Sequence, residues 1–134
     1  MEETVHAALG EEGFQRLVAA FYRRVRIDDL IGPMYPPDDW EGAERRLADF
    51  LLFRFGGDDR YLRERGHPRL RMRHLPFSIG VAERDRWLAL MEEAMDEVSL
   101  GGEARANLAG FFRQVADFIR NRDEPAAPPP GDGG

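Results

Sequence analysis

The strongest constraint on the fold is the spacing of the apolar residues, which recur every three or four positions over long stretches of the chain. This i, i+3, i+4, i+7 pattern is typical of amphipathic helices that turn one face toward a core. It predicts helices over residues 11–26, 39–55, 87–98 and 103–122. No stretch alternates apolar and polar residues as a half-buried strand would, and no repeat is present. The sequence therefore predicts an all-α protein.

Glycine and proline indicate where these helices begin and end. A shorter helix over residues 4–9 is predicted to end at the glycine that follows it, and residues 28–37 form a turn and then an extended corner, because each Pro restricts its predecessor. Asp38 with Glu41 three residues later resembles a capping box, which predicts the start of the next helix. Paired glycines at 56–57 predict its end.

The length of 134 residues suits one domain with a sizeable core. We expect that domain to span residues 1–122. Residues 123–134 are rich in Pro and Gly and carry nothing apolar enough to pack, so they are predicted to form a disordered tail.

Composition also excludes several classes of function. The net charge of -6 argues against a protein that binds nucleic acids or anionic membranes in general. Cysteine is absent, which rules out disulfides, thiolate metal sites, iron–sulfur clusters and a cysteine nucleophile. The N-terminus lacks a signal-peptide pattern and no run approaches ~20 apolar residues, so we expect a cytoplasmic protein.

Residues 66–77 hold two His, three Arg and two Pro in twelve positions. Pro68 suits the first position of a helix, and Pro76 disfavours helix for the residue before it. A short helix is therefore predicted with His74 at its end. The imidazole shares a face with apolar residues, while Arg73 and its neighbour one turn earlier lie about 100° round the helix.

A histidine on an apolar face, with guanidinium groups at the rim, suits a flat apolar ligand that carries anionic groups, and haem b has these properties. Other interpretations stay open on this stretch alone. The histidine could be a hydrogen-bonded core residue, and the arginines could hold phosphates or neighbouring carboxylates.

Several motifs, in this order and spacing, resemble the truncated haemoglobins of group II, also called O-type, and the resemblance covers nearly the whole chain. The matching residues are Phe21-Tyr22, Tyr35-Pro36, 38–44, Gly56-Gly57, 65–77 and 83–88. A departure occurs at residues 10–13, where Gly-Glu-Glu-Gly stands in place of the paired glycines common in the family.

The resemblance implies a truncated globin fold, in which a two-over-two helical sandwich surrounds haem b. His74 would be the axial ligand of the iron. Tyr22, Tyr35 and Trp87 would be the polar residues on the ligand side. Ala43 falls where many globins place a distal histidine, so the sixth position of the iron should be open. The remaining haem contacts implied are walls at Phe21, Met34, Leu47, Phe50 and Ile79, and propionate partners at Arg46, Tyr61 and Arg73.

This interpretation predicts a haem protein that binds O2, NO, CO or peroxide and uses them in redox chemistry or scavenging, with NO dioxygenase-like or peroxidase-like activity as candidates. It also implies a reductase of unknown identity and leaves a homodimer open. Oxygen storage or transport is the alternative within the family. The alternatives of another class are a zinc hydrolase using His67, His74 and Glu64, and a helical interaction module without haem.

Overall fold

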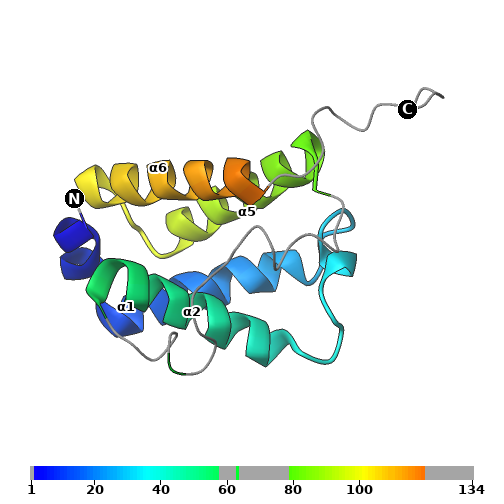
Figure 1. Ribbon diagram of the computed structural model, residues 1–134, viewed down its shortest axis with the longest axis horizontal. Coiled ribbons are helices and arrows are strands. Elements are labelled where there is room, and N and C mark those ends of the chain that lie inside the picture. The colour runs from blue at the N-terminus through cyan, green and yellow to red at the C-terminus, as the bar shows by residue number, and fades with distance from the viewer. Residues whose placement is uncertain (1, 58–62, 64–78, 120–134) are drawn as a thin grey trace.

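The computed structural model of the chain describes residues 2–57, 63 and 79–119. Helices α1 (Glu2–Val25), α2 (Trp40–Gly56), α5 (Val81–Glu97) and α6 (Gly102–Ile119), with the short 3-10 helix η1 (Gly32–Met34), are the regular elements of this part, and no strand occurs in it. Helix α1 packs on α2, α5 and α6, and α5 packs on α6. In Figure 1, α1 and α2 form one layer and α5 and α6 the other. The all-α class and the two-over-two arrangement are therefore confirmed.

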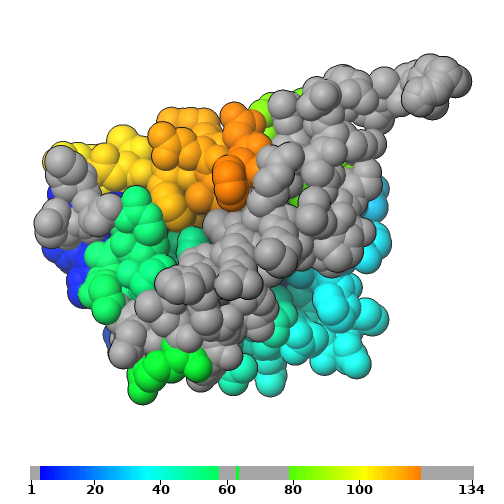
Figure 2. All heavy atoms as spheres, viewed as in Figure 1, coloured from blue at the N-terminus to red at the C-terminus, as the bar shows by residue number. Residues whose placement is uncertain are grey.

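The core lies between the two layers and takes its side chains from every helix of the described part. Its largest fully buried members share the positions at which the sequence pattern placed an inward face. They are Phe14, Leu17, Phe21, Leu51, Met91, Met95 and Leu108. Figure 2 shows α6 and the end of α2 exposed on one face of the molecule. The amphipathic spacing thus determines which side of each helix is buried.

Helix α1 is broken at Gly10, where φ is 63° and ψ is -177°. A positive φ of this kind is strained for residues with a Cβ, so glycine allows the chain to turn there. The segment before the break folds back with Val5 fully buried, and His6 places its ring beside Phe14 with 6.4 Å between the ring centroids. The separate helix predicted before Gly10 is thus present and begins at Glu2.

The predicted capping box at the start of α2 is wrong. Helix α2 begins at Trp40, its N-cap residue is Asp39, and no side chain caps the first turn. The Asp39 carboxylate instead accepts a hydrogen bond from Arg46, at 2.9 Å. The predicted box fails because the N-cap is Asp39 and not Asp38, so Glu41 does not stand three residues after the N-cap. The predicted end at the glycine pair is correct, because Gly57 adopts the left-handed conformation (φ 73°) of a helix C-cap.

Helix α5 is held between its neighbours by arginines. Arg24 of α1 donates to Glu97 at 2.6 Å, and Arg105 of α6 pairs with Glu92 and Asp96, each at 2.7 Å. Partly exposed pairs of this kind contribute only ~0–1 kcal/mol each. Their effect is to fix the register of α5 against both layers.

The predicted helix around His74 and the predicted tail at 123–134 lie outside the described residues, as does the domain boundary at residue 122. Within the described helices, none combines the length and the apolar character that a membrane crossing requires.

Candidate functional site

Three hydrogen-bond donors predicted from the sequence meet between the two layers. Tyr22 lies on α1 with 5% of its surface exposed, Tyr35 directly follows η1, and Trp87 lies on α5. The Tyr22 and Tyr35 rings meet edge to face, with centroids 5.5 Å apart and planes at 87°. Phe21 separates Tyr22 from Trp87 and contacts both rings, at 5.0 and 4.8 Å between centroids. Three elements far apart in sequence thus bring their polar aromatic residues together.

The pKa values of the two tyrosines show how the three polar groups are connected. Burial raises the pKa of Tyr35, and hydrogen bonds with Tyr22 and Trp87 act in the opposite direction. A bond that lowers the pKa of a phenol is one that its oxygen accepts, because that bond stabilises the phenolate. The Tyr22 hydroxyl and the Trp87 indole N–H therefore both donate to the Tyr35 oxygen.

Tyr22 shows the complementary effect. Burial raises its pKa well above the usual value, and the nearby Tyr35 and the hydrogen bond to it raise it further. Donating that bond favours the protonated form of Tyr22. Both phenols are consequently neutral donors at physiological pH.

The donor cluster is bordered by apolar residues that the sequence placed in the haem pocket wall. Phe21 is fully buried on α1, and Ile79 is 7% exposed just before α5. On α2, Ala43 and Phe50 are buried while Leu47 is half-buried, and Met34 of η1 packs against the same core. The described part of the wall is thus apolar, and α2 carries no imidazole that could reach a ligand held there.

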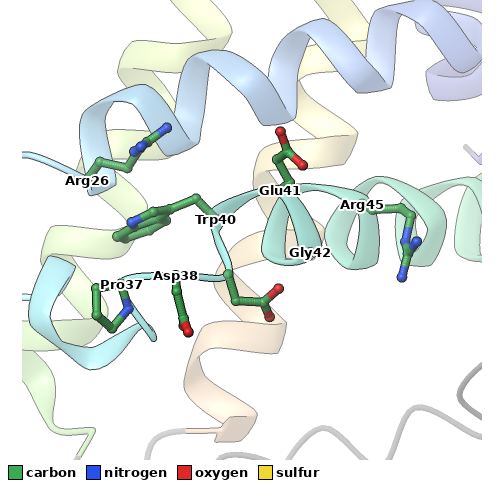
Figure 3. A pocket seen from close by; sticks show the side chains of 8 residues that line it. Arg26, Pro37, Asp38, Trp40, Glu41, Gly42 and Arg45 are labelled. Carbon is green, nitrogen blue, oxygen red and sulfur yellow. The ribbon is translucent and has the colours of Figure 1, made fainter.

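Trp40 is a member of the cluster that sequence reasoning assigned only to the apolar stripe of a helix. Its ring stacks on Tyr35, with centroids 5.4 Å apart and planes at 29°, and lies 6.2 Å from the Tyr22 ring. Figure 3 shows Arg26 reaching from the end of α1 over this indole, and its guanidinium lies 5.5 Å from the ring centroid. The apolar spacing predicted a helix from residue 39, but it gave no sign that Trp40 stacks on the tyrosines of the site.

A surface cavity of about 590 Å³ opens on the outer side of Trp40. It lies at the start of α2, and Figure 3 shows its lining side chains. Arg26, Asp38, Glu41 and Arg45 give it both signs of charge. Trp40 therefore separates the donor cluster from this cavity.

The residues expected around the haem propionates are only partly described. Arg46 lies on α2, half-buried, and pairs with Asp39 at 2.9 Å. Tyr61 and Arg73 lie outside the described residues. Arg46 is close enough to Tyr22 for its charge to lower the pKa of that phenol slightly. Its position beside the donor cluster is compatible with the expected role.

The predicted iron ligand His74 also lies outside the described residues, together with His67 and Glu64 of the zinc alternative. The described histidine, His6, lies so near Gly56 that a Cβ added to this glycine would meet the imidazole ring at 2.7 Å. Gly56 ends α2, whereas the donor cluster adjoins Trp40 at its start. His6 is therefore at the wrong end of α2 to interact with a ligand beside Tyr22.

These features fit a haem protein. An apolar wall suits the macrocycle, and buried O–H and N–H donors suit a small polar ligand beside it. A two-over-two helical fold with such a cluster defines a globin of the truncated class. The bacterial-like globin family matches residues 4–121, and the chain belongs to this family.

The relatives point to one subgroup. The group 2 truncated haemoglobin YjbI of Bacillus subtilis is 43% identical over 119 residues, which cover 89% of each chain. The X-ray structure of the truncated oxygen-avid haemoglobin from Bacillus subtilis superposes with a TM-score of 0.83 at 42% identity, covering 87% of this chain and 98% of that one. A thermostable haemoglobin from Thermobifida fusca gives 0.82 at 43% identity, covering 87% and 96%. The chain is a haem-binding globin whose cofactor is haem b.

Proposed function

We propose that this globin retains O2 tightly and uses it, or peroxide, in redox chemistry or scavenging, and that bulk oxygen transport is not its main role. The observation that carries the proposal is the convergence of Tyr22, Tyr35 and Trp87. When bound, haem b supplies an iron atom that binds diatomic ligands and exchanges electrons. His74 is the proposed axial ligand, and NO and CO are the other diatomic ligands expected.

Tyr35 is the donor that we place nearest the ligand. Its oxygen already accepts from Tyr22 and Trp87, so the proton of its own hydroxyl is the group left to donate. Hydrogen bonds in a chain polarise one another, and a phenol that accepts two bonds donates more strongly. Tyr22 and Trp87 then act on the ligand through Tyr35, whose donor strength their hydrogen bonds raise.

Tight retention follows from the number of donors. Each net hydrogen bond contributes ~0.5–1.5 kcal/mol, so two of them slow ligand release by roughly one to two orders of magnitude. A carrier that must unload is poorly served by slow release, whereas a catalyst that holds O2 for a second reactant is well served. The similarity to an oxygen-avid haemoglobin of Bacillus subtilis supports the same direction.

The proposed chemistry needs an electron donor. Conversion of O2 and NO to nitrate withdraws one electron from the ferrous protein, and reduction of H2O2 to two waters takes two electrons and two protons. A reductase must return these electrons, and its identity is open. Neutral tyrosines beside an apolar wall can polarise a bound oxygen atom without adding charge to the pocket.

The test is a stopped-flow comparison of the wild-type holoprotein with Tyr35→Phe. We expect slow O2 release from the wild type, faster release from the variant, and rapid nitrate formation when the oxygenated protein meets NO. Retention for redox use is contradicted if the wild type releases O2 as fast as Tyr35→Phe. Storage or transport is favoured instead if O2 dissociates from the wild type faster than NO consumes it.

A further inference from the structure

Asp28 lies in the turn between α1 and η1, and its side chain is 8% exposed. One of its carboxylate oxygens, Oδ2, accepts hydrogen bonds from the backbone N–H groups of Leu30 and Ile31, at 3.0 and 2.9 Å. Its other oxygen, Oδ1, accepts a hydrogen bond from the guanidinium of Arg86 on α5. One carboxylate therefore joins a turn of the corner to a helix that is 58 residues away along the chain.

Each of the two elements that Asp28 joins carries a donor of the site close along the chain. On the corner side, Ile31 is the N-cap of η1, and the Tyr35 N–H at the other end of η1 donates to the Gly32 carbonyl at 3.1 Å. On the helix side, Arg86 immediately precedes Trp87. The carboxylate thus sets where η1 begins and where this turn of α5 lies.

The Asp28 carboxylate, 8% exposed, is more buried than the acidic partners in the other arginine pairs of α5, whereas Arg86 itself is 41% exposed. Burial alone would raise the pKa of Asp28, but the Ile31 N–H, the Arg86 guanidinium and the Leu30 N–H outweigh that effect and hold the pKa below its usual value. Asp29 also approaches Arg86, at 3.5 Å, and is 96% exposed. Breaking a pair with one buried carboxylate is more costly than losing an exposed pair, because Asp28 would keep only its two backbone N–H donors and its Oδ1 would lose the guanidinium.

We propose that Asp28 and Arg86 are positioning residues that hold the Trp87 indole against the Tyr35 hydroxyl. Neither side chain donates to the ligand in this arrangement. The pair fixes the distance between η1 and α5, and the hydrogen bond from Trp87 to Tyr35 depends on that distance. The proposal deepens the proposed function, because it rests on Tyr35 and Trp87 being the donors that retain the ligand.

The test uses the holoprotein with three variants of the pair and one matched control. Arg86→Met removes the charge but keeps a long side chain, and Arg86→Lys restores a cation without the planar fork. Asp28→Asn keeps an oxygen for the turn and removes the charge that faces Arg86. The control, Arg84→Met, removes an arginine two residues away on α5 that pairs with Asp117 of α6. Thermal unfolding of each variant establishes that it folds.

The first measurement is the indole N–H signal of Trp87 in ¹H–¹⁵N spectra of the ferrous carbon monoxide complex. The chain has 2 Trp, so Trp87→Phe assigns both signals. We expect Arg86→Met and Asp28→Asn to shift the Trp87 signal toward that of a solvent-bonded indole, Arg86→Lys to shift it less, and Arg84→Met to leave it in place. The proposal is overturned if the signal in Arg86→Met coincides with that in Arg84→Met.

The second measurement is the rate of O2 dissociation, which loss of one hydrogen bond should raise roughly 2- to 10-fold in Arg86→Met and Asp28→Asn. The two measurements separate the failure of this proposal from that of the proposed function. If the Trp87 signal moves while neither Arg86→Met nor Trp87→Phe changes O2 release, the pair positions the indole as inferred, and the retaining role of the donors is wrong. If release changes in Trp87→Phe alone, the donors retain the ligand and the positioning role is wrong.

Discussion

The ring of Tyr22 meets the ring of Tyr35 edge to face, with 5.5 Å between centroids, and the Tyr22 hydroxyl donates to the Tyr35 oxygen. Trp87 donates to the same oxygen from the opposite layer of the fold. A single phenol oxygen therefore links α1, the corner after η1 and α5. A substitution at any of the three donors should therefore change the hydrogen bonding of the other two, and the first prediction rests on this coupling.

Tyr22→Phe and Trp87→Phe should each raise the O2 dissociation rate, by at most the roughly 2- to 10-fold of one net hydrogen bond of ~0.5–1.5 kcal/mol, because each removes a bond that strengthens Tyr35 as a donor to the ligand. The double variant should depart from the product of the two effects, since both donors share one acceptor. Stopped-flow displacement of O2 by carbon monoxide measures all three rates. Trp40→Phe removes an indole N–H on the outer side of Tyr35 and should change the rate less than Trp87→Phe does. Equal rates in the wild type and both single variants would refute the assignment of these donors.

Alkaline pH provides a second prediction. Folding raises the pKa of Tyr22 above its unfolded value, so its contribution to stability is complete below the unfolded pKa of about 10 and is lost as the pH rises through the higher folded value. We expect unfolding to become easier above pH ~10 and the pH dependence to be weaker in Tyr22→Phe. Denaturant titrations between pH 7 and 11 measure this. O2 dissociation should stay constant up to pH ~9, and acceleration near neutral pH would show that a donor is titrating there.

His74→Ala should give largely colourless protein, because His74 is expected to supply the only bond from a side chain to the iron. The measurement is the Soret absorbance per chain after purification. His6→Ala is the matched control, since His6 packs near Gly56 at the far end of α2 and should leave haem content unchanged. An unchanged ferrous spectrum in His74→Ala would transfer the ligand role to another residue.

The propionate prediction can be tested in both directions. Arg46→Ala and Arg73→Ala should speed haem transfer to an apo-acceptor without unfolding the protein, because exposed charge pairs contribute only ~0–1 kcal/mol each. The Asp39 carboxylate forms an ion pair with the Arg46 guanidinium at 2.9 Å. Asp39→Asn should weaken this pair, leave the guanidinium available to a propionate, and so slow haem transfer. If Asp39→Asn instead speeds the transfer as much as Arg46→Ala does, the Arg46–Asp39 pair stabilises the start of α2 and has no role at the propionates.

The helices were predictable from sequence because apolar periodicity is a local signal that survives packing. The break at Gly10 and the cap at Gly57 were predictable for the same reason, since each depends on one residue type at a chain turn. The start of α2 lies one residue after the predicted position, but its capping was not predictable. The N-cap is Asp39 rather than Asp38, and the Asp39 carboxylate pairs with Arg46 seven residues away.

The donors Tyr22, Tyr35 and Trp87 were named from the family resemblance, yet their mutual hydrogen bonds could not be, because they connect three separate elements. Asp28 illustrates the limit most clearly. The sequence marked it only as a turn residue, and its partner Arg86 preceded the helix predicted over residues 87–98, whereas the structure begins that helix at Val81. Pairing across 58 residues depends on how the layers stack, which no local pattern specifies.

The break at Gly10 separates the first residues of α1 from the rest of the helix. In the segment before it, His6 lies beside Gly56 at the far end of α2 and Val5 is fully buried, while the residues after it carry Tyr22. Val5 and His6 are therefore constrained by packing, and we expect a label or fusion partner attached to the exposed positions of this segment to leave oxygen affinity unchanged.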